Sequence, residues 1–255
     1  SLEVLELEDG TEFTVGLRVD AEGGLYGEAG ERDQVVNYGQ WALVSEVVLN
    51  VEPGLLNGSN TLAFERFTSE GPLALLPIST DQRKYSLVWC APLDTVQRRL
   101  ACSESDFSSE LRQQFGRRIS IEHIGPRKSF PLGMNWRDKL VQGRRVAIGN
   151  AAQILHPVAG QGLNLGLRDA MQLCRSIDPS TVAEEHRLST ALHDFEKSRV
   201  ADRQVVVKMT DWMVKGFSNH NPLLGTGRQM ALNVMEFTPP LRKQFAELML
   251  FGLAV

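Results

Sequence analysis

Apolar and polar side chains alternate over residues 2–19, on both sides of a turn at Glu8-Asp9-Gly10. Alternation with a period of two is typical of a strand with one buried face, and a short turn containing Asp-Gly joins antiparallel neighbours. The stretch therefore predicts a hairpin or the last strands of a sheet. Its apolar positions are Val4, Leu5, Leu7, Phe13, Val15 and Leu17.

Strand-like runs continue at short spacing up to residue 132, separated by turns that contain glycine, proline and asparagine. Closely spaced strands of this kind form a mainly antiparallel sheet. A short helix interrupts them at 106–115, with Ser105 or Asp106 as its cap and Gly116 at its end. The predicted strands span residues 42–49, 61–67, 73–78, 85–90, 120–124 and 127–132.

The pattern changes at Val146-Ala147-Ile148, a compact apolar run that ends at Gly149 and predicts a buried parallel strand. Helical spacing of three and four residues dominates beyond it. Helices are expected at 164–177, 183–217 and 227–253, with Pro222 and Pro239-Pro240 as breaks. The fold class is therefore α/β in an α+β arrangement, with a mainly antiparallel sheet and C-terminal helices.

The composition is that of a globular protein, because 42% of the 255 residues are hydrophobic, 23% are charged and the net charge is -4. Nucleic acid is not expected as a partner, since the chain lacks a dense basic face. Three cysteines without C-x-x-C spacing indicate reduced thiols in the cytoplasm, and the scattered histidines predict no metal site. No apolar run reaches the eighteen residues that a membrane span needs.

The most informative segment is 146–170, where Gly160-Gln161-Gly162 opens a helix. Glycines at a helix start let a ligand approach the backbone, and the N–H groups at the positive end of the helix dipole favour an anion or an electron-rich ring edge. A glycine-rich helix start that merely packs well remains the alternative. The G-x-G-x-x-x-G spacing of Gly160, Gly162 and Gly166 does not match the dinucleotide fingerprint, because His156-Pro157-Val158-Ala159 separates it from the strand.

Two motifs carry a resemblance to a known family. GNAAQ at 149–153 with HPVAGQGLNLGLRDA at 156–170 resembles the second flavin-binding motif of the aromatic-ring hydroxylases of the para-hydroxybenzoate hydroxylase type. AFERFTSEGPLALLP at 63–77 is similar to the middle-domain strands of the ubiquinone-biosynthesis members. The resemblance implies an FAD-dependent monooxygenase: NAD(P)H reduces FAD, O2 adds to flavin C4a, and the terminal oxygen of this hydroperoxide passes to a prenylated phenol.

The resemblance also implies positions for the cofactor. Asn150 would meet the ribityl and pyrophosphate region, and the loop from Pro157 to Asn164 would lie along the isoalloxazine. The helix start would then stabilise the anionic reduced flavin. The implied cofactor-binding residues are Gly149, Asn150, Pro157, Gly160, Gln161, Gly162, Leu163 and Asn164.

A substrate site is expected in the sheet. By strand alternation, Arg66 would face the substrate cavity with the phenylalanines of its strand on the opposite face. The candidates for an apolar wall suited to a prenylated phenol are Trp41, Phe64, Phe67, Leu75, Pro77 and Trp89. A solvated or ion-paired Arg66 and a plain apolar core are the alternatives. No residue is assigned a catalytic role, and His156 is expected to be structural.

Four segments are expected: residues 1–32 as the remnant of an FAD-binding domain, 33–135 as the substrate-binding sheet, 136–180 as the FAD-binding segment and 181–255 as the C-terminal helices. Asn150 and Gln153 depart from the acidic and histidine forms common in the family. The Gly-x-Gly-x-x-Gly loop of the family has no counterpart here, and the chain starts at Ser1 without Met. We therefore expect a truncated fragment that binds FAD poorly and does not turn over.

Other interpretations remain open. One is a noncatalytic assembly module of a biosynthetic complex, and another is a flavin hydroxylase of a different aromatic substrate. The amphipathic C-terminal helix is compatible with a protein partner or with peripheral contact to the inner membrane, although packing on its own sheet is the simpler interpretation. The oligomeric state is not predicted.

Overall fold

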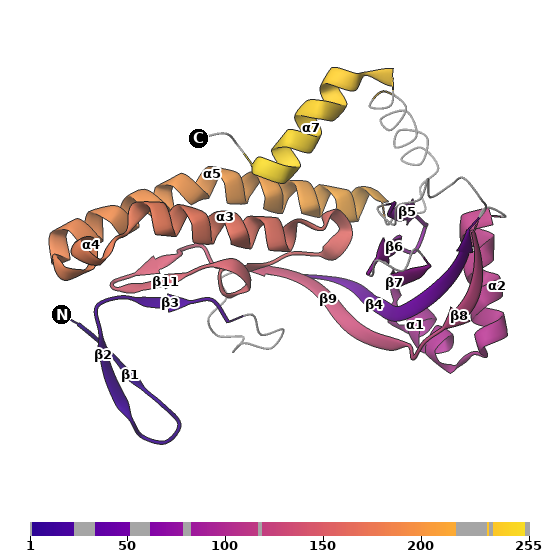
Figure 1. Ribbon diagram of the computed structural model, residues 1–255, viewed down its shortest axis with the longest axis horizontal. Helices are drawn as coiled ribbons and strands as arrows, with labels where there is room; N and C mark the ends of the chain where they lie inside the picture. Colours follow the sequence, from indigo (N-terminus) through magenta and orange to yellow (C-terminus); the bar gives the residue numbers. More distant parts are fainter. Residues whose placement is uncertain are drawn as a thin grey trace. The chain divides into compact units, whose positions relative to one another are not determined.

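The computed structural model describes residues 2–22, 34–51, 62–78, 83–116, 119–217, 234 and 237–252 (Figure 1). The chain divides into two compact units. Unit 1 comprises Ser1–Val36, Met134–Trp212 and Leu232–Val255, and unit 2 comprises Asn37–Gly133 and Met213–Ala231. Among the described residues, none of the helices combines the length and apolar character that crossing a membrane requires.

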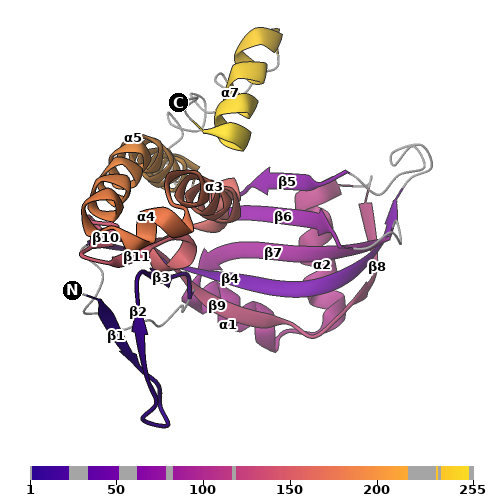
Figure 2. The ribbon, with the colours of Figure 1, turned by 60° about the vertical axis from the view of Figure 1, so that its left-hand side comes forward.

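An antiparallel sheet forms most of unit 2, as the alternating sequence predicts (Figure 2). Its strand order is β12-β9-β4-β7-β6-β5, and β8 also pairs with β4. The strands are β4 (Gln34–Val51), β5 (Phe64–Phe67), β6 (Pro72–Pro77), β7 (Lys84–Pro92), β8 (Ile119–Ile124) and β9 (Lys128–Trp136). The short β12 (Gln153–Ile154) joins the end of β9 that belongs to unit 1.

Two helices, α1 (Leu93–Ala101) and α2 (Glu104–Phe115), pack on one face of this sheet. Their buried side chains Val96, Phe107 and Leu111 join the sheet residues Leu43 and Trp89 in a single apolar core. Burial of this face explains why the strands alternate so regularly.

The sequence did not predict α1, which starts directly at the end of β7. It also placed the start of the next helix too late. The α2 cap is Ser103, whose hydroxyl accepts the backbone N–H of Asp106 at 3.1 Å, rather than Ser105 or Asp106. Gly116 ends α2 as predicted.

Unit 1 contains the predicted hairpin of β1 (Glu3–Glu6) and β2 (Glu12–Val15). A second, three-stranded sheet has the order β10-β11-β3, in which β11 is parallel to β3. This confirms the predicted parallel strand. The strands are β3 (Arg18–Asp20), β10 (Val141–Gln142) and β11 (Arg145–Ala147).

The helices of unit 1 are α3 (Gln161–Ser176), α4 (Pro179–Ala183), α5 (Glu185–Phe217) and α7 (Pro239–Phe251). Helices α3 and α5 lie side by side over the small sheet (Figure 1). The predicted 183–217 helix is confirmed as α5. Residues 227–233, 235, 236 and 253 of the last predicted helix lie outside the described residues. The predicted break at Pro239-Pro240 is confirmed: Phe237 is helical, Thr238 is not, and Pro239 starts α7, because proline is well tolerated at the first helical position.

Arg99 lies in the core of unit 2 with only 2% of its side chain exposed. Its guanidinium lies 3.5 Å from the centre of the Trp89 ring. It also donates to Glu70 at 2.6 Å and to Glu110 at 2.8 Å. A buried cation between two carboxylates and an aromatic face fastens α1 and α2 to the sheet.

We expect Arg99→Ala to lower the free energy of unfolding by about 3 kcal/mol, because it leaves Glu70 without its partner and opens a cavity beside Trp89. Urea unfolding followed by circular dichroism measures the change. Arg83→Ala is the control, because Arg83 and Glu122 form an exposed pair at 2.9 Å, which should contribute less than about 1 kcal/mol. Equal losses in the two variants would contradict the interpretation.

Candidate functional site

The candidate site begins where β11 ends. Gly149 opens a 3-10 turn, η3 (Gly149–Ala151), that crosses α3 at Gly166. A side chain at Gly166 would place its Cβ 3.1 Å from the Gly149 Cα. The two glycines therefore let the turn and the helix approach backbone to backbone.

A second turn, η4 (Pro157–Ala159), leads into α3. Gly160, the N-cap residue of α3, has φ +60, in the left-handed region, and as a glycine it has no side chain that could cap the helix. A Cβ built at Gly160 or at Gly162 would meet no atom within 4 Å. The start of α3 thus combines uncapped N–H groups with open space above two glycines, which is an arrangement suited to an electron-rich ligand.

A buried carboxylate holds these two segments together. Asp169 of α3 is 0% exposed and accepts hydrogen bonds from three groups. The Gly149 N–H donates to Oδ2 at 3.2 Å, the Gln153 amide donates to Oδ2 at 2.7 Å, and the Arg199 Nε donates to Oδ1 at 2.7 Å. Asp169 thereby ties the turn after β11 to both long helices.

A second buried arginine extends this network along α5. Arg203 donates to the Gln153 Oε1 at 2.8 Å and to the Arg137 carbonyl at 2.8 Å. Arg137 in turn donates to the Ala151 carbonyl at 2.9 Å. Burial lowers the pKa of Arg203, and the nearby Asp169 carboxylate opposes that shift. The η3 turn is therefore held by side chains at both ends, through the N–H group of Gly149 and the carbonyl group of Ala151.

His156 precedes η4 and is 1% exposed. Its Nδ1 accepts the Val158 N–H at 3.2 Å, which caps the short 3-10 helix. Burial lowers the pKa of His156 from 6.5 to about 4. A neutral imidazole that accepts a backbone hydrogen bond is a structural group at physiological pH.

The structure brings all eight predicted cofactor residues into one stretch of unit 1, between the end of β11 and the first turn of α3. Asn150, Pro157, Gly160 and Leu163 are exposed, while the Gln161 side chain is buried. Gln161 therefore belongs to the packing beneath the helix start, and the exposed groups provide the surface that a ligand could contact.

The predicted substrate residues all lie in unit 2, and Leu75 is part of its core. Leu75 is 0% exposed and packs under the helices, and Phe64 packs against the same cluster. The register pairs Phe64 with Leu75 and Arg66 with Leu73, so Phe64 shares the face of Arg66. The expectation that the phenylalanines lie opposite Arg66 is correct for Phe67 and wrong for Phe64. Pro77 is partly buried and Arg66 is exposed.

The face of the sheet that α1 and α2 leave uncovered presents other residues. Ala74, Val88 and Val44 form a row across β6, β7 and β4, with Glu65 opposite Ala74 on β5. Sequence reasoning missed them, although they are the alternate positions of the same strands. Phe64 and Leu75 lie instead on the face that α1 and α2 cover.

Sequence reasoning also missed Asp169, Arg199 and Arg203. A signal was present in α5, where Arg199 and Arg203 continue the spacing of the buried Phe195. Charged residues at core positions of a helix need buried partners. Within the part of the chain that the structure describes, no cluster of three or more metal-ligand side chains is found.

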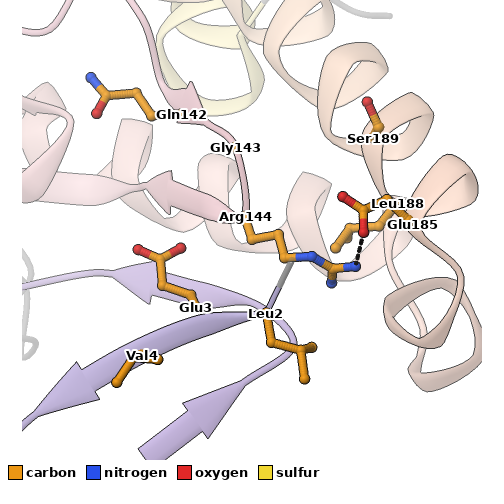
Figure 3. Close-up of a pocket in the computed structure, with 9 residues that line it drawn as sticks. All are labelled: Leu2, Glu3, Val4, Gln142, Gly143, Arg144, Glu185, Leu188 and Ser189. Carbon is orange, nitrogen blue, oxygen red and sulfur yellow. Dashed lines mark hydrogen bonds and ion pairs between the residues drawn. The ribbon is translucent and has the colours of Figure 1, made fainter.

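A separate cavity of about 490 Å³ lies between the first hairpin and α5 (Figure 3). Arg144 crosses it and donates to the Gly16 carbonyl at 2.6 Å and to Glu185 at 3.2 Å. None of the predicted cofactor residues lines it. Its lining residues are Leu2, Glu3, Val4, Gln142, Gly143, Arg144, Glu185, Leu188 and Ser189.

Comparison with solved structures finds proteins of the same fold. The chain aligns with PqsL of Pseudomonas aeruginosa in complex with 2-aminobenzoylacetate at a TM-score of 0.68 and 20% identity, over 87% of this chain and 61% of that one. For HpxO of Klebsiella pneumoniae complexed with FAD and uric acid, the TM-score is 0.64 and the identity 16%, over 90% and 58%. At these identities the likeness shows a shared fold.

Comparison of sequences gives closer relatives. The chain is 32% identical over 244 residues to ubiquinone hydroxylase UbiL of Rhodospirillum rubrum, covering 94% of this chain and 55% of that protein. It is 27% identical over 247 residues to 3-demethoxyubiquinol 3-hydroxylase of Escherichia coli, covering 95% and 61%. The chain thus spans between about half and three fifths of these relatives. Residues 37–210 match the family model described as FAD binding domain, and the chain therefore belongs to that FAD-binding family.

Proposed function

We propose that this chain is part of a flavin-dependent monooxygenase that hydroxylates a prenylated phenol in ubiquinone biosynthesis. The observation that carries the proposal is the start of α3, where Gly160 and Gly162 leave open space over uncapped N–H groups. Two relatives whose names specify ubiquinone or ubiquinol hydroxylation support the choice of substrate class.

The residues present fit the isoalloxazine half of FAD. The N–H groups of Gly162, Leu163 and Asn164 would face the pyrimidine edge of the ring, where a helix end worth about half a positive charge favours negative charge. The exposed Asn150 would offer an amide to the hydroxyl groups of the ribityl chain. The hydrogen bonds to Asp169 would hold the 149–153 segment in a fixed position against α3.

FAD, when bound and reduced by NAD(P)H, supplies the activation of O2. The overall reaction consumes the phenol, O2, NAD(P)H and a proton, and it yields the hydroxylated phenol, water and NAD(P)+. The role that we propose for the described residues of this chain is to bind and orient the cofactor and the phenol. We assign none of them a proton-transfer role.

The sequence offers no strand with a Gly-x-Gly-x-x-Gly loop for the ADP half of the cofactor. We expect the 255-residue chain by itself to bind FAD poorly and to lack turnover. Gel filtration with added FAD, read at 280 nm and at the visible flavin band, measures the bound fraction. Stoichiometric flavin eluting with the chain would contradict this expectation.

The test of the activity is an assay of the full-length protein with NAD(P)H, O2 and either a prenylated phenol or a soluble aromatic acid. Product mass spectrometry should show one added oxygen on the prenylated phenol. Hydroxylation of the aromatic acid alone would favour a flavin hydroxylase of another pathway. A protein that binds no FAD and forms no product would favour the noncatalytic assembly module.

The location is part of the same proposal: a cytoplasmic protein that meets its substrate at the inner membrane. A phenol with a long prenyl tail partitions into lipid, and the end of α7 exposes Leu250 and Phe251, at 58% and 72%. Partner proteins of a biosynthetic complex would compete for this surface. Flotation of the intact protein with anionic vesicles measures the membrane contact.

Gly162→Ala separates cofactor binding from helix stability. Alanine in the first turn of α3 should leave the free energy of unfolding equal or raise it by up to about 1 kcal/mol, because glycine is the weaker helix former. Its methyl group would occupy the open space over the helix start, so we expect the FAD dissociation constant of the full-length protein to rise about tenfold.

Fluorescence titration of FAD and thermal unfolding measure the two effects of Gly162→Ala. Leu167→Ala is the control, because Leu167 lies one turn further along α3 and is 55% exposed. Unchanged FAD affinity in Gly162→Ala would rule out the proposed placement of the cofactor.

The buried His156 makes stability depend on pH. Its pKa is lowered from 6.5 to about 4 in the folded chain, so its contribution is complete above pH 6.5 and is lost as the pH falls toward 4. The loss should reach about 3 kcal/mol. Urea unfolding at a series of pH values measures it, and His156→Asn should flatten the curve in this range. An unaltered pH dependence in the variant would argue against a buried neutral imidazole.

A further inference from the structure

The C-terminal end of α7 lies directly on a buried ion pair. Gly252 ends the helix with φ +79 and ψ -166, a backbone conformation that residues with a Cβ rarely adopt. A Cβ at this position would lie 2.5 Å from the Asp202 Oδ1 and closer still to the Arg168 Nη1. Glycine is therefore required twice, by the backbone conformation and by the contact.

That ion pair joins α3 to α5. The Arg168 Nη1 donates to the Asp202 Oδ1 at 3.1 Å, and the two side chains are 13% and 3% exposed. Burial lowers the pKa of the Arg168 guanidinium, while the Asp202 carboxylate opposes this shift. The end of α7 covers this pair, so displacement of α7 would admit water to it.

Asp202 has a second cation beside it. The Arg199 Nη2 lies 2.8 Å from the Asp202 Oδ2, at ion-pair distance although outside hydrogen-bond alignment. The Nε of the same guanidinium donates to Asp169 at 2.7 Å, and Asp169 accepts the Gly149 N–H. A continuous row of buried charges thus runs from the end of α7 to the turn after β11.

We propose that Gly252 is a positioning residue: the seat of α7 on the Arg168–Asp202 pair fixes Arg199 and Asp169, and through them the Gly149 turn. A buried row of ion pairs has few alternative arrangements, because each charge that moves loses compensation that water cannot replace inside the protein. Docking of α7 therefore sets the geometry of the turn. The consequence for the cofactor rests on the proposed function, whereas the consequence for the turn does not.

The test is amide hydrogen exchange in the 255-residue chain, which needs no cofactor. Gly252→Val should displace the end of α7 and raise the exchange rate of the Gly149 amide about tenfold, since that amide is protected by Asp169. In the full-length protein the same substitution should weaken FAD binding by a similar factor. Wild-type protein that binds no FAD would refute the proposed function and leave the exchange result intact.

Two variants control for backbone strain and for added side-chain volume. Gly143→Ala introduces a Cβ at φ +61 in open space, so it tests backbone strain without a clash. Ala246→Val places the same valine side chain on the exposed side of α7. Both variants should leave the exchange rate of the Gly149 amide unchanged.

Asp202→Asn provides a second route if Gly252→Val does not fold. It keeps the shape of the side chain, removes the shared charge and should also raise the exchange rate at Gly149. The proposal is overturned if the amides at the end of α7 exchange faster in Gly252→Val while the Gly149 amide keeps its wild-type rate. Wild-type protection of Gly149 in Asp202→Asn would overturn it as well.

Discussion

The architecture of unit 1 depends on the requirement that a fully buried carboxylate be compensated. Asp169 has no exposed surface, and removing an ionised carboxyl group from water costs several kcal/mol unless charges and donors surround it. The compensation comes from an arginine of α5, an amide of β12 and the N–H of Gly149. Each of these donors lies on a different element. The hydrogen bonds of one carboxylate therefore fix the positions of three elements relative to one another.

Such a network is a poor source of stability, because desolvation of the charges offsets most of their attraction. The network instead fixes the positions of the segments that it joins. The N–H groups at the start of α3 can favour a ligand only if they point at it before it arrives, and preorganisation of this kind requires a rigid support. The close crossing of Gly149 and Gly166 acts in the same direction, since the backbones of the two segments are in contact there.

Period-two alternation was sufficient to predict the hairpin and the large sheet, because burial of one face leaves a direct record in the sequence. The same record does not say which face is buried against helices. Leu75 and Trp89 were considered for the apolar wall of the substrate cavity, yet both belong to the core. The smaller Ala74 and Val88 lie on the face that α1 and α2 leave uncovered. Helix α1 was missed because nine residues following a strand directly are too few to establish a helical period. The cap at Ser103 was missed because neighbouring polar residues offered equally good hydroxyl and carboxyl groups.

The cofactor segment was recognised through a family resemblance, and spacing alone left an ordinary packed helix start equally acceptable. The contacts that bear on this choice join residues 16 to 30 positions apart, such as Gln153 with Asp169 and Asp169 with Arg199. No local pattern encodes such pairs, although charged residues at the core positions of α5 required partners somewhere in the fold. A helix start that only packs would not need its preceding turn held from below by two arginines. Because the turn is held in this way while the glycines above it stay open, these contacts support the cofactor site that we propose.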